Sequence, residues 1–408
     1  MLIASLLLAA TVATPIPLDR AQRAFAEAKL ASDEDGGKLW GRALYGPMFF
    51  VDPQTRFVVA NQADANGALK ADGGVFTGTL PNDIPIGNTA TTWSGVKWTM
   101  VVWGAVGQRA TSQRALLLHE CWHRIQDDVG FPATQGDNAH LDSLDGRVWF
   151  LLELRALAKA LRNEDRAIAI NDALLFRAKR RALFANASKN EHELEANEAL
   201  AEYTGFALRG TPDGESRLAF ARVLDNVDRN TSFVRGFAYL TGPAYGLLLD
   251  AASPGWTHSL KVTDDLANLL SKAAKVTPSG DAESRAIAYG GAELRAAEEK
   301  RDREHREQIA KFRALLVDGP TIEIPMIDAH YGFDPNAVIA LGDAGSVHPT
   351  LSVSGPWGTI STERGARIAK DFSAFYFAVA DREQLKLNDG WKLVPGKREG
   401  DLLITRNR

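Results

Sequence analysis

Two histidines and one glutamate lie close together in the stretch ALLLHECWHRIQDDVG, residues 115–130. On an α-helix, His119 and His123 lie one turn apart on the same face, so both imidazoles can bind one ion. Glu120 lies about 100° around the helix from His119, close enough to contact a metal-bound water without being a ligand. The pattern His-Glu-x-x-His therefore predicts a zinc centre with Glu120 as the catalytic base.

The alternative is an ordinary core helix whose two histidines are hydrogen-bonded. The chain contains only eight histidines, so the complete pattern is unexpected by chance. Burying two imidazoles and a carboxylate without a metal also requires several hydrogen-bond partners. Cys121 points away from the histidines and is interpreted as a small buried residue. Because it is the only cysteine, intramolecular disulfides and cysteine-based zinc clusters are excluded.

A catalytic zinc has three protein ligands and leaves one position for water. The segment NEALAEYTG, residues 197–205, offers Glu198 as the third ligand. Glu202 lies one turn later and can accept a hydrogen bond from the second ring N–H of a zinc-bound histidine. Glu195 remains an alternative third ligand, because it lies three residues before Glu198 on nearly the same helix face.

Together, the segments HECWH and NEALAEY resemble the gluzincin metallopeptidases, in which His-Glu-x-x-His is followed by an Asn-Glu segment. The resemblance covers mainly residues 96–205 and implies a thermolysin-like catalytic core, with an edge strand followed by two metal-bearing helices. On that analogy, residues 96–103 are the edge strand that binds the substrate backbone. Residues 143–185 look like an insertion between the two segments. The Gly-x-Met-Glu-Asn signature of related aminopeptidases is absent, so recognition of an N-terminal amine is not implied.

The oxyanion formed during hydrolysis needs a further hydrogen-bond donor. Tyr239 and Tyr245, in SFVRGFAYLTGPAYGLLLD, and His258 are candidates. A helix break at Gly242-Pro243 would bring the backbone or Tyr245 near a cleft. The alternative for both tyrosines is a structural role, as residues of the core or of its boundary that do not contact the substrate.

These observations predict hydrolysis of peptide bonds by a metal-activated water, with Zn²⁺ as cofactor and a peptide or protein as substrate. One alternative is an exported binding or scaffold protein that retains a zincin fold without turnover. The intact Glu120 argues against it, because loss of that residue is the simplest route to inactivity. The other alternative is a zinc amidohydrolase that acts on a non-peptide amide, since its chemistry would look the same.

Composition is ordinary for a globular protein, at 45% hydrophobic and 24% charged residues. The formal net charge of −4 gives no electrostatic reason to expect a nucleic-acid partner. Residues 1–18, MLIASLLLAATVATPIPL, contain no charged side chain and read as a signal peptide of a secreted or periplasmic protein. A membrane anchor and a buried N-terminal helix are alternatives, because the usual Lys or Arg near the start is missing. After signal cleavage we expect no stable membrane insertion.

The fold class expected is α+β: a zincin-like core of a small, mainly antiparallel sheet and a helical bundle, followed by a β-rich unit. Residues 19–110 form the helix-and-sheet part of the predicted catalytic unit, and residues 111–316 form its helical part. Residues 320–408 form a C-terminal β-rich accessory domain. Helices are expected at residues 19–35, 111–128, 143–162, 164–185, 190–209, 215–228, 232–251 and 283–316.

Overall fold

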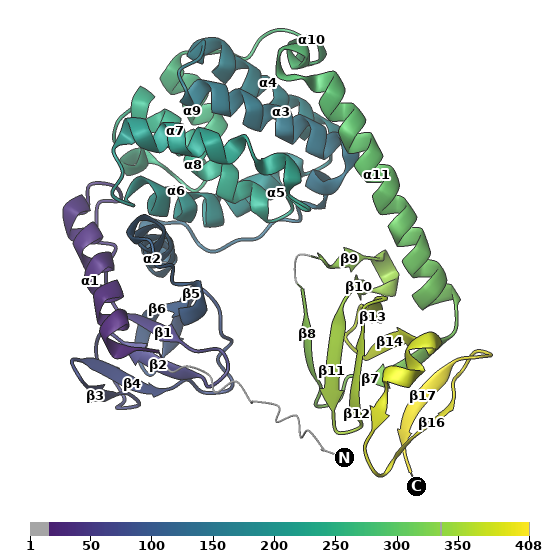
Figure 1. Ribbon diagram of the computed structural model, residues 1–408. Coiled ribbons are helices and arrows are strands. Elements are labelled where there is room, and N and C mark those ends of the chain that lie inside the picture. Colours follow the sequence, from purple (N-terminus) through teal and green to yellow (C-terminus); the bar gives the residue numbers. More distant parts are fainter. Residues whose placement is uncertain (1–15, 335–336, 408) are drawn as a thin grey trace, which may run out of the picture. The chain divides into compact units, whose positions relative to one another are not determined.

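The computed structural model describes residues 16–334 and 337–407. The chain divides into two compact units, one up to Ala292 and one from Glu293. Residues 293–316, which the sequence analysis grouped with the catalytic helices, therefore belong to the second unit. Helices dominate the first unit and strands the second, which confirms the predicted α+β class with a β-rich C-terminal region (Figure 1).

The first unit begins with helix α1 (Leu18–Asp35) and a six-stranded sheet. Its strands are β1 (Met48–Val51), β2 (Phe57–Ala60), β3 (Lys70–Asp72), β4 (Val75–Thr79), β5 (Thr89–Trp93) and β6 (Val96–Val102). The order is β3-β4-β2-β1-β6-β5, and only the β1–β6 pair is parallel. On one face Phe50 stacks on Phe25 of α1, while Phe49 packs on Trp93 and Trp98 in an apolar cluster on the other.

The prediction that residues 96–103 form the edge strand is wrong. Strand β6 lies inside the sheet between β1 and β5, and β5 is the edge strand. The hairpin turn at Ser94-Gly95 has positive φ angles of 49° and 76°, the left-handed geometry that joins two strands tightly. This turn places β5 on the outer side of β6.

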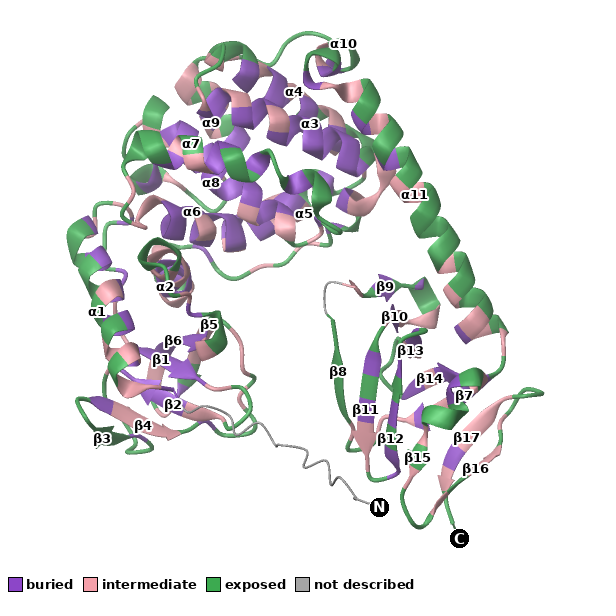
Figure 2. Ribbon diagram, in the orientation of Figure 1, coloured by how far each residue is buried: buried purple, intermediate pink, exposed green. Residues whose placement is uncertain are grey.

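The helical part of the first unit contains nine α-helices after the sheet, counted over the described residues. They are α2 (Ala110–Ile125), α3 (Leu144–Leu161), α4 (Arg166–Leu183), α5 (Ala187–Leu194), α6 (Leu200–Ala207), α7 (Asp213–Leu224), α8 (Gly236–Ala252), α9 (Leu266–Ala274) and α10 (Ala282–Ala286). A π-helical turn, Glu195–Ala199, joins α5 to α6. Buried residues are concentrated along α3 and α8 (Figure 2).

Helix α8 continues through Pro243, so the predicted break is wrong. Gly242 and Gly246 allow the helix to pack closely on its neighbours. A Cβ atom at Gly242 would lie 2.1 Å from the carbonyl oxygen of Ala199, and one at Gly246 would lie 2.2 Å from the ring of Tyr203. These two glycines therefore serve close helix packing, and that packing holds the helix together despite the missing N–H of proline.

The second unit begins within α11 (Gly291–Arg313) and continues with two sheets. The strands are β7 (Thr321–Pro325), β8 (His330–Phe333), β9 (Ile339–Ala340), β10 (Ser346–His348), β11 (Leu351–Gly355), β12 (Gly358–Thr362), β13 (Ala366–Ile368), β14 (Ala374–Ala378), β15 (Lys386–Leu387), β16 (Trp391–Pro395) and β17 (Leu402–Arg406). One sheet has the order β16-β17-β7-β14-β13-β10-β9, and the other has β15-β12-β11-β8. Apolar residues of both sheets, such as Ile324, Val353 and Phe375, form one core between them.

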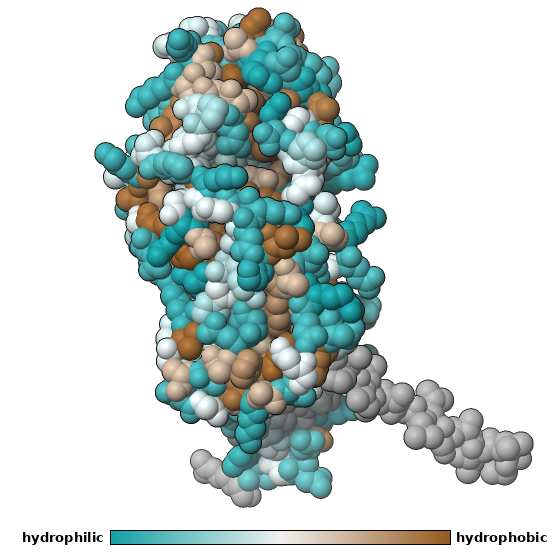
Figure 3. All heavy atoms as spheres, turned by 90° about the vertical axis from the view of Figure 1, so that its left-hand side faces the viewer, coloured by the Kyte–Doolittle hydropathy of each residue, from teal (hydrophilic) through white to brown (hydrophobic). Residues whose placement is uncertain are grey.

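The predicted signal peptide falls almost entirely on residues outside the described part of the chain. Among the described helices, none is both long and apolar enough to cross a membrane. Hydrophilic side chains cover most of the face shown in Figure 3, and the hydrophobic ones are scattered over it.

Candidate metal centre

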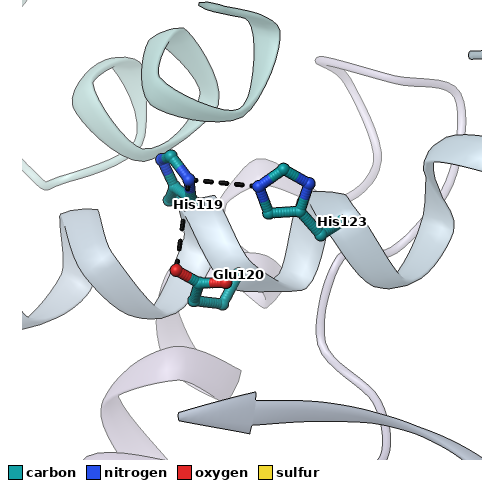
Figure 4. A group of neighbouring side chains, drawn as sticks. All are labelled: His119, Glu120 and His123. Carbon is teal, nitrogen blue, oxygen red and sulfur yellow. Dashed lines mark hydrogen bonds and ion pairs between the residues drawn. The ribbon is translucent and has the colours of Figure 1, made fainter. Parts of the chain in front are cut away.

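Helix α2 brings His119, Glu120 and His123 together, all three largely buried (Figure 4). The Nε2 atoms of the two histidines lie 3.2 Å apart. Glu120 Oε1 lies 4.0 Å from Nε2 of His119. The helix begins at Ala110, and Arg109 is its N-cap residue.

Glu198 joins the two histidines from the π-helical turn. Its Oε2 atom lies 3.6 Å from Nε2 of His119 and 3.6 Å from Nε2 of His123. Glu195, the alternative third ligand, is buried elsewhere and accepts a hydrogen bond of 2.5 Å from Arg177. The structure thus brings Glu198, and not Glu195, to the histidines.

The π-helical turn explains why the two glutamates separate. On an α-helix, residues three apart point to nearly the same side. A π turn closes its hydrogen bonds from i to i+5 and holds more residues, so the directions of Glu195 and Glu198 diverge further. Such turns occur frequently at functional sites within helices.

Both imidazoles are oriented through their other nitrogen atom. Nδ1 of His119 lies 2.8 Å from Oε2 of Glu202, the partner expected from the sequence. Nδ1 of His123 lies 2.7 Å from Oε1 of Gln126, which in turn donates to Asn197 across 3.2 Å. Sequence reasoning missed Gln126 as a partner, although its place three residues after His123 on a helix is the signal for it. Because both Nδ1 atoms are engaged, both Nε2 atoms face the common point.

Of the three candidate oxyanion donors, the structure brings only Tyr239 to the centre. Its ring stacks on His119 with centroids 5.7 Å apart, and its hydroxyl donates to Glu198 across 2.7 Å. The Tyr245 hydroxyl is fully buried and donates to Glu153, since α8 does not break to release it. The His258 ring is hydrogen-bonded to the carbonyl of Lys38. Neither Tyr245 nor His258 lines the cavity at the centre.

The charges around the histidines favour a bound cation. Burial alone would lower the pKa of His119, but hydrogen bonds to Glu198 and Glu202 raise it to about 10. Burial raises the pKa of Glu120. Burial also opposes ionisation of Glu198, yet hydrogen bonds to both histidines hold its pKa well below the usual range. Three carboxylates thus surround two imidazoles, and a divalent cation would offset their negative charge.

The donor set fits zinc. The three candidate ligand atoms are separated by 3.2, 3.6 and 3.6 Å. A tetrahedral zinc with bonds of about 2.0–2.1 Å spaces its ligand atoms about 3.3 Å apart, close to these values. Oε2 of Glu120 is buried and has no hydrogen-bond partner among the described residues, which is unusual for a native carboxylate outside a functional site.

The centre opens into a cavity of about 780 Å³. Its walls come mainly from α2, α6 and α8, from the π-helical turn, and from the edge strand β5 and its neighbour β6. Asn88, Thr89 and Ala90 belong to the edge-strand wall. The cavity is therefore large enough for a peptide-sized ligand, and an unpaired strand edge runs along it.

Comparison with known proteins identifies no relative: no family model, no curated protein and no solved structure matches this chain.

Proposed function

We propose that this protein is a zinc-dependent peptidase of gluzincin type. The observation that carries the proposal is the convergence of His119, His123 and Glu198 in an open cavity, with Glu120 beside them. These three residue types form a three-ligand set that is used by catalytic zinc sites. When bound, zinc supplies a Lewis acid that polarises the substrate carbonyl and activates water.

The protein's own residues supply the proton transfers. One carboxylate oxygen of Glu120 has no hydrogen bond from the described residues, so it can accept a proton from the attacking water as the new C–O bond forms. The same proton then passes from Glu120 to the leaving nitrogen as the C–N bond breaks. The hydroxyl of Tyr239, beside Glu198, is the donor that we assign to the developing oxyanion.

Strand β5 supplies a place for the substrate main chain. It is the edge of its sheet, so its outward N–H and C=O groups are not used in pairing with another strand. An extended peptide can add to such an edge as a further strand. We assign this role to β5 in place of β6.

Metal analysis and a glutamate variant test the proposal. Purified protein reconstituted with Zn²⁺ should bind about one zinc per chain and should hydrolyse peptides in a chelator-sensitive way. The Glu120→Gln variant should keep its zinc and lose about 100-fold or more of the rate, because it lacks the base. Absence of bound zinc after reconstitution would falsify the proposal. Zinc binding without hydrolysis of any peptide or simple amide would instead favour the scaffold alternative.

A further inference from the structure

Arg209 lines the same cavity as the metal centre, and it has no acidic partner among the described residues. The two other basic residues of the wall lie near carboxylates. Lys97 pairs with Asp127 at 3.0 Å, and Arg235 lies 3.7 Å from Glu198. Among the described residues, no carboxylate lies within 4.0 Å of the Arg209 guanidinium.

The surroundings of Arg209 are prepared for an anion. Its Cζ atom lies 3.6 Å from the ring centroid of Phe206, so the guanidinium rests on an aromatic ring. Stacking of this kind leaves the N–H groups at the edge available for hydrogen bonds. The Nε atom is buried and has no hydrogen-bond partner among the described residues. Burial lowers the pKa of Arg209, as expected for a desolvated cation without a counter-charge.

The position of Arg209 relative to the metal centre follows from the antiparallel crossing of α2 and α6. Glu202 contacts His119, and a Cβ atom at Gly205 would lie 2.2 Å from the carbonyl oxygen of Ala115, one turn earlier in α2. Arg209 follows beyond the end of α6, towards the first turn of α2. The five residues from Glu202 to the end of α6 rise about 7.5 Å, and Arg209 lies two residues further along the chain.

We propose that Arg209 binds a carboxylate of the substrate, about two to three residues from the bond that is hydrolysed. The separation follows from the rise of about 3.3 Å per residue of an extended peptide. The inference rests on the proposed peptidase function and names its substrate class: peptides with a free C-terminal carboxylate or an acidic side chain at that place. In either case the carboxylate accepts charge-assisted hydrogen bonds from the guanidinium.

Selection from a peptide library tests the subsite by binding. Zinc-loaded Glu120→Gln protein is immobilised and mixed with random acetylated hexapeptides, made once with a C-terminal carboxylate and once with a C-terminal amide. Mass spectrometry measures the acid-to-amide ratio of the bound peptides and the Glu-to-Gln ratio at each position of the amides. The same measurement on Glu120→Gln with Arg209→Gln shows whether Arg209 causes any preference. Arg222→Gln on the same background is the matched control, because Arg222 is exposed on α7 and does not line the cavity.

We expect about tenfold enrichment of one anionic class, the size expected for a hydrogen bond to a charged group. Enrichment of the acids identifies a C-terminal carboxylate, whereas enrichment of Glu over Gln at one position of the amides identifies a side chain. The enrichment should vanish with Arg209→Gln and persist with Arg222→Gln, while the zinc content of both proteins stays unchanged.

The subsite is overturned if acids bind as well as amides and Glu peptides bind as well as Gln peptides. It is also overturned if an anionic preference survives Arg209→Gln. Cleavage of the library by the wild-type protein separates the two proposals. Hydrolysis without any anionic preference would leave the peptidase function standing without the subsite. An Arg209-dependent preference in binding, without hydrolysis, would leave the subsite standing without the peptidase function.

Discussion

At the scale of single residues, the candidate centre depends on groups that hold the imidazoles as much as on the imidazoles themselves. Glu202 and Gln126 each engage one Nδ1 atom, across 2.8 and 2.7 Å. A ring held through Nδ1 presents Nε2 in one orientation, so less entropy is lost when a metal binds. A carboxylate partner also makes the ring a better electron donor to the metal.

Replacing Glu202 should weaken zinc binding without removing a ligand. In Glu202→Ala the His119 ring loses its acceptor, and we expect the zinc affinity to fall about 10–100-fold. Glu202→Gln keeps an acceptor without the charge, so its zinc affinity should lie between those of the wild type and the alanine variant. Competition with a chromophoric chelator measures these affinities. An affinity of Glu202→Ala equal to that of the wild type would show that Glu202 does not orient the ligand.

At the scale of secondary-structure elements, the third ligand is set by how α8 packs on the turn that carries it. Gly242 of α8 lies directly against the carbonyl of Ala199, the last residue of the π-helical turn. Glu198 is its neighbour in that turn, and Tyr239 of α8 donates to the Glu198 side chain. The turn, its glutamate and α8 therefore form one packed group.

A methyl group at Gly242 should disturb this group. A Cβ atom there would meet a backbone atom at 2.1 Å, so the turn or the helix must shift. We expect Gly242→Ala to cost about 1–3 kcal/mol of stability and to weaken zinc binding through Glu198. The control is Gly236→Ala at the start of the same helix, where a Cβ atom meets nothing within 4 Å. Chemical denaturation and zinc titration measure both effects, and equal behaviour of the two variants would contradict the packing argument.

At the scale of the whole molecule, a buried network of ion pairs holds helices of the first unit together. Arg177 and Arg180 of α4 are fully buried, and both pair with Glu153 of α3. Arg180 also pairs with Glu191 of α5, and Arg181 pairs with Asp265 at the start of α9. Burial opposes the charge of both Glu191 and Asp265, but the neighbouring arginines hold their pKa values well below the usual range.

Acid should therefore unfold this unit as the network is protonated. A carboxylate whose pKa is lowered in the folded state stabilises the fold above the pKa of the unfolded chain, about 4, and the stabilisation is lost as the pH falls further. Urea denaturation between pH 7 and pH 3, with chelator present to exclude metal effects, should show this loss. Asp265→Asn should lower the free energy of unfolding at pH 7 and make it fall less steeply as the pH decreases. Asp83→Asn, at an exposed position, should leave both the value at pH 7 and the steepness unchanged. A decline that is equally steep in Asp265→Asn would contradict the role of Asp265.

The division into two units gives a second prediction at this scale. All residues of the candidate centre and of its cavity belong to the first unit. We expect residues 16–292, produced alone, to fold and to bind zinc with an affinity within a few-fold of that of the full chain. Circular dichroism and zinc titration of both proteins test this. A folded fragment that has lost its zinc affinity would show that the second unit contributes to the centre.

The sequence by itself determined the local parts of the candidate centre. Helical periodicity alone places His119 and His123 on one face, because the spacing of four residues fixes their relation once a helix forms. The same spacing places Glu198 and Glu202 one turn apart in the second segment. These are short-range relations, which depend on backbone geometry and not on what the element packs against.

Only the tertiary structure decided which of the remaining candidates meet. The π-helical turn separates Glu195 from Glu198, and the packing of α8 leaves Tyr239 at the centre while Tyr245 stays buried. The order of strands, which makes β5 the edge, depends on pairing with β1 from far along the chain. Arg209 likewise reaches the cavity through the crossing of two helices. Each of these outcomes results from close packing between distant segments, which no periodicity in the sequence encodes.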